Sequence, residues 1–251
     1  MITRAKTQQE IKIMHEAGRM HCAILDLLEK QVTEGISTKD LADIASKELK
    51  TFGAKPAFLG YYGFPDVLCT SVNDEVVHGI PRPDKILRSG DIISFDFGVL
   101  HRGLITDAAR SVIVGSALDK KDQQLVSATK QSLEAGIDVV KDGVKTGTIG
   151  AAIQSILEKA GFGIVREFVG HGVGHQLHEE PNIPNYGLKH TGTMLGKNMT
   201  IAIEPMATKK SEAVYIDSDG WTVKTSDGSR SAHFEETILI TETGAEIITR
   251  K

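Results

Sequence analysis

The sequence lacks most features of secreted proteins, membrane proteins and proteins with structural zinc sites. Only two cysteines, Cys22 and Cys69, occur in 251 residues, and their spacing fits neither a disulfide framework nor a CxxC zinc motif. No run of about 18 apolar residues is present, and the start MITRAKTQQE lacks the charged and apolar segments of a signal peptide. We therefore expect a cytoplasmic protein with reduced thiols.

An excess of charge of one sign is also missing. The 29 basic and 33 acidic residues give a net charge of -4, so no bulk electrostatic attraction to nucleic acid or anionic membranes is expected. A hydrophobic content of 40% is ordinary for a globular protein of a length that can bury a large core. We expect a monomer with no specific nucleic-acid partner and no membrane partner.

Several common catalytic motifs are absent. Neither His15-Glu16 nor His178-Glu179 is followed by the second histidine of an HExxH zinc motif. GTMLGKN is one residue short of a phosphate-binding loop and lacks its Ser or Thr, and no GxSxG serine-nucleophile motif occurs. These absences exclude the familiar zincin, P-loop and serine-hydrolase sites.

Capping signals and hydrophobic spacing predict four helices. Thr7 and Glu10 form the sequence pattern of a capping box ahead of an apolar stripe at helical spacing, and Ser37 with Asp40 repeats the pattern. Gly161 follows the last periodic residue of the fourth segment, where a helix commonly ends. The predicted helices span residues 8–30, from Ser37 to Gly53, 119–141 and 148–160.

Short β-rich runs follow each pair of predicted helices. They are broken by Gly and Pro between residues 58 and 114, and they return in the final third of the chain. The order of helix, helix and strands therefore occurs twice, which indicates an α+β fold with an internal duplication. We expect one catalytic domain with pseudo-twofold halves of roughly 1–115 and 116–251, each with helices on a curved antiparallel sheet.

Each predicted half carries two acidic residues in apolar strand segments. These residues are Asp96 in DIISFDFGV, Asp107 in ITDAARSV, Glu204 in IAIEPM and Glu235 in HFEETILIT. Any one of them could be an exposed strand residue, and either Glu235 or its neighbour Glu236 could be solvated. Together their charge of -4 would balance two divalent cations, which would compensate the cost of burying ionised carboxylates.

Histidines supply candidate nitrogen ligands. The glycine-rich segment VGHGVGHQLHEEP contains His171, His175 and His178, and His78 lies in NDEVVHGIP. A single histidine in such a loop is more often structural, but three within eight residues favour a site. Oxygen-rich coordination favours Mn, Fe or Co, and a neutral imidazole is also compatible with Zn.

These motifs together carry a family resemblance. The chain resembles type I methionine aminopeptidases in the order and spacing of TSVNDEVVHGIP, DIISFDFGV, ITDAARS, GHGVGHQLHEEP, IAIEPM and SAHFEETILI. The resemblance covers nearly the whole chain and implies the pita-bread fold and removal of N-terminal methionine from nascent proteins when the next residue is small. It also implies two metal ions bound by Asp96, Asp107, His171, Glu204 and Glu235.

The resemblance assigns further roles around the metals. Glu204 would also move the proton, while His78 and His178 would contact the scissile peptide and the tetrahedral intermediate. Apolar and aromatic side chains suit a thioether, and the predicted methionine pocket contains Tyr61, Phe64, Cys69, Leu177 and Trp221. Relatives commonly have His at Tyr62 and an aromatic residue at Leu177, so the shape of the pocket departs from the family pattern. His175 is not a family ligand and is expected to be a loop residue.

Two alternatives remain within the same fold. Prolidases and aminopeptidase P relatives share the five ligands but have longer chains with an added N-terminal domain. Non-catalytic relatives bind peptides and have lost ligands, whereas all five are present here. Expected partners are N-terminal methionyl peptides and nascent chains, with a transient ribosome contact as a further expectation.

Overall fold

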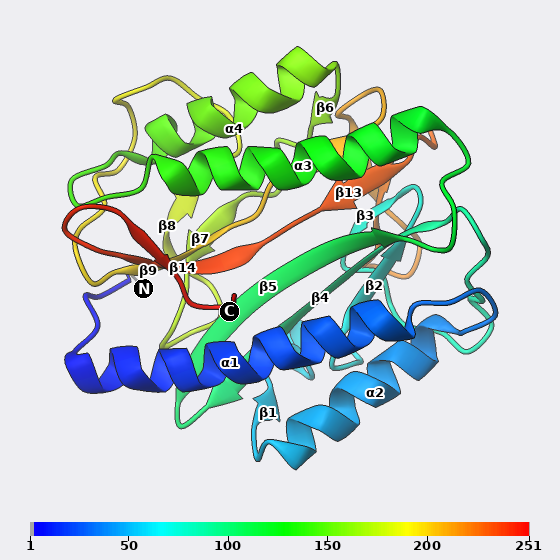
Figure 1. The fold of residues 1–251 in the computed structure, drawn as a ribbon, viewed down its shortest axis with the longest axis horizontal. Coiled ribbons are helices and arrows are strands. Elements are labelled where there is room, and N and C mark those ends of the chain that lie inside the picture. Colours follow the sequence, from blue (N-terminus) through cyan, green and yellow to red (C-terminus); the bar gives the residue numbers. More distant parts are fainter. Residues whose placement is uncertain (1–2, 251) are drawn as a thin grey trace.

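The computed structural model describes residues 3–250, with two pairs of helices covering one face of curved sheets (Figure 1). The helices are α1 (Gln8–Gln31), α2 (Thr38–Thr51), α3 (Lys120–Asp138) and α4 (Thr146–Ala160). Both predicted capping boxes are present, and Gly161 ends α4 in the left-handed conformation with φ 77°. Local capping and periodicity therefore predicted all four helices to within a few residues.

The first half contains a four-stranded sheet built around one long hairpin. Its strands β4 (Ile92–His101) and β5 (Leu104–Ile113) pair over their whole lengths, and β2 (Cys69–Val72) and β1 (Lys55–Pro56) add to β4. Between β1 and β2 lies the short 3₁₀ helix η1 (Tyr61–Gly63). Helices α1 and α2 pack on this sheet.

The second half contains a five-stranded sheet in the order β15-β14-β9-β7-β8. These strands are β7 (Gly170–Gly172), β8 (Glu179–Ile183), β9 (Thr200–Ile203), β14 (Glu236–Ile240) and β15 (Ala245–Ile247). Two three-stranded sheets complete the fold. One contains β13 (Ser231–His233), β10 (Met206–Thr208) and β6 (Gly163–Ile164). The other contains β11 (Val214–Ile216), β12 (Val223–Thr225) and β3 (Glu75–Val77).

Strand β5 joins the two halves. The backbone N–H of Glu235 donates to the carbonyl of Ala109 at 3.0 Å, and the reverse bond is 3.2 Å. The Thr237 hydroxyl donates to the carbonyl of Asp107 and accepts from its N–H, both at 2.8 Å. These bonds bring residues about 130 positions apart to one place near the middle of the sheets.

Two large apolar clusters form the core. One consists mainly of residues 17–114 with Leu177, and the other mainly of residues 125–240 with Ile92. Each cluster lies largely between the helices and strands of one half, because each helix pair has a single apolar face to cover. The predicted boundary near residue 115 stays a prediction.

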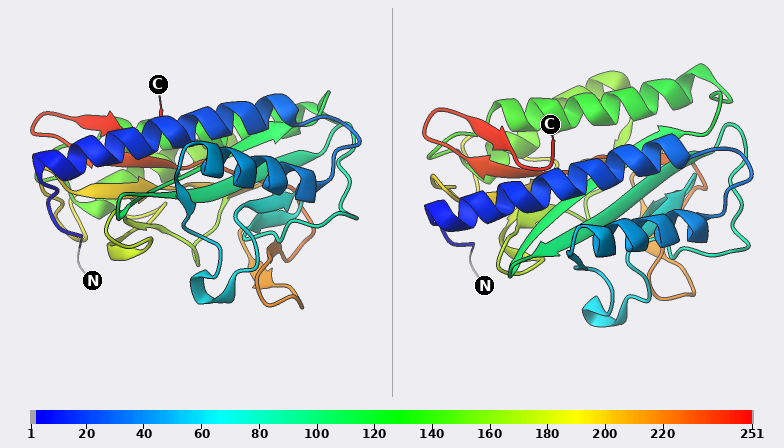
Figure 2. Two further views of the ribbon diagram at one scale, coloured as in Figure 1. Left: turned by 90° about the horizontal axis from the view of Figure 1, so that it is seen from below. Right: turned by 60° about the horizontal axis from the view of Figure 1, so that its bottom comes forward.

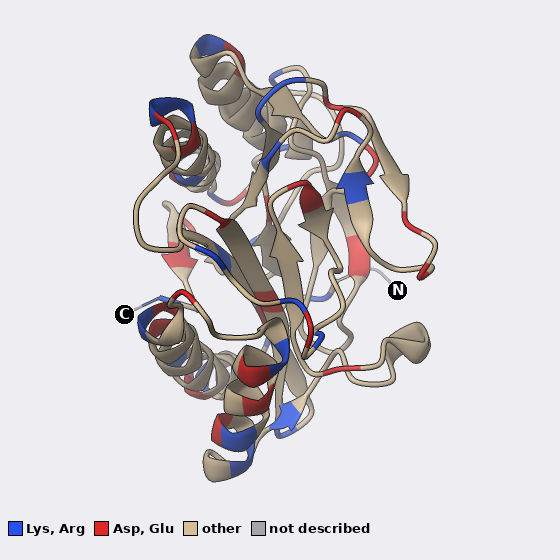
Figure 3. Ribbon diagram, turned by 90° about the vertical axis from the view of Figure 1, so that its right-hand side faces the viewer, with Lys and Arg blue, Asp and Glu red and all other residues tan. Residues whose placement is uncertain are grey.

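The opposite face of the sheets carries loops and short elements instead of α-helices. Figure 2 shows η1 and the β11–β12 segment projecting on the side away from α1 and α2. In Figure 3, basic and acidic residues alternate along helices and loops without collecting on one side of the view. Both cysteines are buried free thiols. Within residues 3–250, no helix combines the length and apolarity needed to cross a membrane.

Candidate metal centre and substrate cavity

A cavity of about 230 Å³ brings together all of the predicted site residues. Its lining contains the five expected ligands, both expected substrate-contacting histidines and the five expected pocket residues, together with Phe58 and Tyr62: Phe58, Tyr61, Tyr62, Phe64, Cys69, His78, Asp96, Asp107, His171, Leu177, His178, Glu204, Trp221 and Glu235. These side chains come from both halves of the chain. Tertiary structure therefore creates this cavity from segments that are far apart in sequence.

Three of the four acidic residues, Asp96, Asp107 and Glu235, enter the cavity from β5 or from positions paired with it. Asp96 on β4 lies opposite Ala109 of β5, and Ala109 also bridges to Glu235. Asp107 lies two residues earlier on β5, with its backbone held by Thr237. Because alternate strand residues point to one face, Asp107 and Ala109 share a face of β5. The pairing therefore places carboxylates of both halves beside one another.

Burial leaves oxygens of three of these carboxylates without a hydrogen-bond partner in the described chain. Asp96, Asp107 and Glu235 are 8%, 3% and 3% exposed, and each has one side-chain oxygen with no hydrogen-bond partner among residues 3–250. Burial, followed by repulsion from the neighbouring carboxylates, raises the pKa of Asp107 and Glu235 well above their usual range. Buried acidic oxygens without partners are the donor set that a divalent cation requires. The cluster therefore fits metal ions.

His171 presents a nitrogen to this cluster in a defined tautomer. Its Nδ1 lies 2.9 Å from the carbonyl oxygen of Gly172, so Nδ1 carries the proton and donates it. Its Nε2 then has a free lone pair and lies 3.5 Å from Glu204 Oε1 and 3.9 Å from Asp107 Oδ2. Burial lowers the pKa of His171 to about 3, which keeps the imidazole neutral. This arrangement is typical of a metal-binding histidine held by a backbone carbonyl.

The glycine-rich loop allows close packing beside His171. A Cβ atom at Gly172 would lie 2.7 Å from Thr3 Cβ and 2.9 Å from the carbonyl oxygen of Glu180. His175 points away from the cavity, where its Nε2 lies 2.7 Å from Glu10 Oε1 of α1. The expectation that His175 is a loop residue outside the metal cluster agrees with this position.

The histidines at the edge of the cavity are oriented by aromatic rings. His178 Nδ1 lies 2.9 Å from the hydroxyl of Tyr61, and its ring centroid is 4.3 Å from that of His171. His78 has a left-handed backbone with φ 60° and contacts Phe168 edge to face. Left-handed backbone is uncommon for a residue other than glycine, and such strain gathers at functional sites.

Aromatic and apolar side chains form the remaining wall. Phe64 contacts Trp221 edge to face at 5.2 Å between centroids, while Leu177 is only 3% exposed. Cys69 pairs with Asp96 in the sheet, and burial followed by the Asp96 charge raises the pKa of the Cys69 thiol. Tyr62 is 87% exposed at the mouth of the cavity. The departure from the family pattern at Leu177 therefore lies in the wall of the cavity, whereas the departure at Tyr62 lies at its entrance.

Three features were missed or left open by the sequence: Phe58, His233, and the burial of Glu235 and Glu236. Phe58 also lines the cavity. His233 is buried with its Nε2 3.7 Å from Glu204 Oε2, and its position two residues before Glu235 was the available signal. The suggestion that Glu235 or Glu236 is solvated is wrong, because both are buried, and Glu236 accepts hydrogen bonds from Arg250 and Thr249. Glu235 also lies just before β14 instead of inside it.

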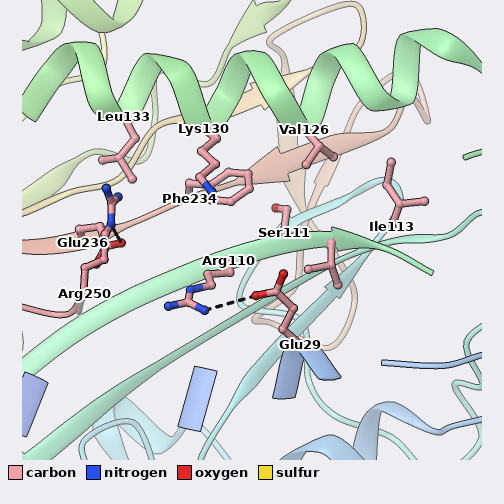
Figure 4. Close-up of a pocket in the computed structure, with 11 residues that line it drawn as sticks. Glu29, Arg110, Ser111, Ile113, Val126, Lys130, Leu133, Phe234, Glu236 and Arg250 are labelled. Carbon is pink, nitrogen blue, oxygen red and sulfur yellow. Dashed lines mark hydrogen bonds and ion pairs between the residues drawn. The ribbon is translucent and has the colours of Figure 1, made fainter. Parts of the chain in front are cut away.

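A larger cavity of about 580 Å³ lies on the helix-covered face, between α1 and α3 and over β5 (Figure 4). We call it the outer groove; it is lined by Glu29, Arg110, Ser111, Val112, Ile113, Val126, Lys130, Leu133, Phe234, Glu236 and Arg250. None of the predicted site residues lines it. Among its charged side chains, Arg110 pairs with Glu29 and Arg250 pairs with Glu236.

Comparison with known proteins agrees with this site. The model of metallopeptidase family M24 matches residues 12–242. The chain belongs to metallopeptidase family M24. It is 46% identical over 245 residues to methionine aminopeptidase 1 of Bacillus subtilis (strain 168), with 98% of each chain covered. The crystal structure of a methionine aminopeptidase from Thermotoga maritima superposes with a TM-score of 0.98 at 45% identity and covers 100% of both chains.

Within family M24, the similarity is weaker to prolidases. The prolidase from Pyrococcus furiosus has a TM-score of 0.79 and 25% identity, and the match covers 98% of this chain but 65% of the prolidase. The chain therefore belongs to the type I methionine aminopeptidases of family M24. The predicted α+β pita-bread fold is confirmed.

Proposed function

We propose that this chain removes N-terminal methionine with two divalent metal ions held by Asp96, Asp107, His171, Glu204 and Glu235. Methionine aminopeptidase activity follows from its full-length similarity to these metallopeptidases. The observation that carries the metal assignment is the set of partnerless oxygens on Asp96, Asp107 and Glu235 within one buried acidic cluster. Two divalent cations would balance the four negative charges of the acidic ligands.

Glu204 is the proposed proton carrier. Bound divalent ions supply Lewis acidity, which makes a water molecule acidic enough to attack near neutral pH. Glu204 is 13% exposed at the cavity and has both of its oxygens near imidazoles, Oε1 by His171 and Oε2 by His233. In the proposed step, Glu204 accepts a proton from the attacking water. The new C–O bond forms, the C–N bond breaks, and Glu204 returns the proton to the leaving amine.

His178 and His78 are the proposed hydrogen-bond donors to the substrate. We assign Tyr61 as the donor to His178 Nδ1, which lies 2.9 Å away. The other nitrogen, Nε2, then carries a proton and donates it to the carbonyl oxygen as negative charge develops there. Burial lowers the pKa of His78 to about 4, so its neutral ring also has one N–H to donate to the peptide group. These two histidines would orient and stabilise the reacting peptide.

The aromatic wall is the proposed methionine pocket. Phe64, Trp221 and Leu177 offer the apolar and polarizable surface that a thioether prefers. The residue after methionine would meet His178, His78 and the η1 loop, and the Tyr61–His178 contact ties the η1 loop to His178. A rigid wall there disfavours large side chains by about 1–3 kcal/mol per misfit. Met-Gly, Met-Ala and Met-Ser peptides are therefore the proposed substrates, alongside nascent chains with such ends.

Metal removal and restoration test the proposed function. The purified protein is treated with a chelator and assayed on Met-Ala peptides before and after addition of Mn, Fe, Co or Zn, while calorimetry counts the ions. We expect loss of activity, recovery with at least one metal and up to two binding sites. Full activity in metal-free protein would refute the proposal, and equal rates for Met-Ala and Met-Ile peptides would refute the narrow cleft.

The same assay separates the alternatives within the fold. A prolidase-like enzyme would cleave Xaa-Pro dipeptides faster than Met-Ala peptides, and a non-catalytic relative would cleave neither after metal addition. The match covers only 65% of the prolidase chain, which favours methionine aminopeptidase activity over prolidase activity. The expected cytoplasmic location, monomeric state and ribosome contact stay predictions.

A further inference from the structure

His233 is a buried imidazole without a hydrogen-bond partner among residues 3–250, at the edge of the acidic cluster. It lies at the end of β13 and is 1% exposed. Among residues 3–250, neither its Nδ1 nor its Nε2 has a hydrogen-bond partner. A buried polar side chain without any partner is rare in folded proteins. The imidazole therefore remains available to a bound group.

The backbone of His233 is held in place from the first half of the chain. The Ser111 hydroxyl donates to the His233 carbonyl and accepts from the His233 N–H, both at 2.8 Å. Because the Ser111 proton is used in this way, Ser94 is the donor in the 2.7 Å contact between the two serine hydroxyls. On the other side, β13 pairs His233 with Met206 of β10. The imidazole is thus attached to a backbone fixed on both sides.

Two groups of ligand atoms meet at Glu235. Atoms of Asp107, His171 and Glu235 lie within 4.8 Å of one another, and so do atoms of Glu204, His233 and Glu235. His233 Nε2 is 3.7 Å from Glu204 Oε2. Nitrogen and oxygen ligands at roughly 2.0–2.2 Å from one ion are separated by about 3–4 Å at common coordination angles. The spacing in the second group therefore suits one shared cation.

We propose that His233 is a sixth protein ligand, a second imidazole that binds the ion on the Glu204 side of the metal pair. This inference rests on the proposed two-metal function and extends it. Glu204 lies between the two imidazoles, because its Oε1 is 3.5 Å from His171 Nε2 and its Oε2 is 3.7 Å from His233 Nε2. A second imidazole among the ligands favours Fe, Co or Zn over the hard ions Mg and Ca.

Dicobalt protein provides a test that does not depend on turnover. Imidazoles bound to Co(II) give strongly shifted N–H proton resonances, which can be assigned by ¹⁵N-histidine labelling. We expect two such resonances in the wild type, from His171 and His233, and one in His233→Leu. Calorimetry should show one of the two Co(II) ions binding about tenfold or more weakly in this variant, with little change for the other.

His21→Leu is the matched control. His21 is equally buried, but its Nδ1 contacts Thr106 Oγ1 at 3.1 Å and it belongs to neither ligand group. This variant should keep both shifted resonances and both affinities. His233→Gln provides a polar replacement if the leucine variant unfolds, and it should also lose one resonance. Unfolding curves of the apoproteins check the fold of each variant.

The outcomes separate the two proposals. A wild type that binds two Co(II) ions but shows a single shifted N–H resonance, or a His233→Leu variant with both resonances, overturns the role of His233 alone. A wild type that binds fewer than two ions overturns the two-metal function as well. Two resonances in the wild type, one in each His233 variant and two in His21→Leu establish the sixth ligand.

Discussion

The cavity at the metal centre and the outer groove differ in how their charges are balanced. The outer groove is the larger, about 580 Å³ against about 230 Å³, and it contains acidic and basic residues that pair directly. Arg250 Nε lies 3.0 Å from Glu236, and Arg110 lies 2.8 Å from Asp26. We call the cavity at the metal centre the inner cavity. In the described chain, its lining includes four acidic residues but no lysine or arginine.

This difference shows that uncompensated charge identifies the site better than cavity size. Charges that pair within the protein stabilise the fold and need no ligand. Carboxylates that are buried without a basic partner are costly, so they persist where a cation binds. Substitutions in the two cavities should therefore separate catalysis from stability.

The largest expected effect is on turnover when a charge of the inner cavity is removed. Glu204→Gln keeps the size of the side chain but cannot carry the proton, so kcat for Met-Ala peptides should fall by about 10²- to 10⁴-fold. The matched control in the outer groove is Glu29→Gln, whose side chain is 52% exposed and which should retain wild-type kcat. Comparable activity of the two variants, each with metal restored, would contradict the role of Glu204.

A second prediction concerns the stability of the metal-free protein. Burial raises the pKa of Asp96 from 3.8 to about 7 and that of Glu204 from 4.5 to about 8. The folded state then holds these protons more tightly than the unfolded state, so the stabilisation is lost as pH rises from about 4 to about 8.

Thermal unfolding of the apoprotein measures this effect. Its Tm should fall by about 5 °C or more across that pH window, and saturating Co(II) or Mn(II) should remove the fall. Glu204→Gln is the control, because its apoprotein should show a weaker dependence. If the Tm of the apoprotein instead rises steadily between pH 5 and 8, groups of the protein itself compensate the charge of the buried carboxylates.

A smaller effect is expected in the apolar wall. Leu177→Ala removes surface from the methionine pocket, so KM for Met-Ala peptides should rise about fivefold or more, with little change in metal affinity. Leu177→Met, which conserves volume, should keep KM close to the wild-type value. Weakened metal binding with unchanged KM would instead place Leu177 beneath the metal centre.

The smallest effect on catalysis is expected from the outer groove. Arg250→Met leaves Glu236, which is 6% exposed, without its basic partner and should lower the free energy of unfolding by about 1–3 kcal/mol. Denaturant unfolding measures this loss, and kcat/KM should stay within about twofold of wild type. A large loss of kcat/KM in a folded variant would show that the groove communicates with the metal centre.

Local sequence signals predicted the elements that depend on neighbouring residues. The capping boxes at Thr7 and Ser37 and the glycine at 161 each act within one helical turn, so they are readable from sequence. The family resemblance named the twelve site residues that the cavity contains. Their roles as ligands and substrate contacts remain the proposals tested above.

Features that depend on distant pairing could not be read in this way. Sequence left the solvation of Glu235 and Glu236 open, because adjacent strand residues point to opposite faces and either face can be covered. The structure covers both faces: Glu235 lies in the inner cavity and Glu236 in the outer groove. His233 was missed because its position beside the acidic cluster, with no hydrogen-bond partner for its ring in the described chain, arises only when β13 packs against both halves.

The sequence by itself determined the helices, the repeated order of elements and the identity of the acidic and histidine side chains. These follow from capping, periodicity and side-chain chemistry, which act over short distances along the chain. Only the tertiary structure decided that β5, which carries Asp107, pairs with Glu235 through Ala109, and that no lysine or arginine lines the inner cavity in the described chain. Those facts depend on which strands meet across about 130 residues, and the electrostatic demand for metal ions arises only there.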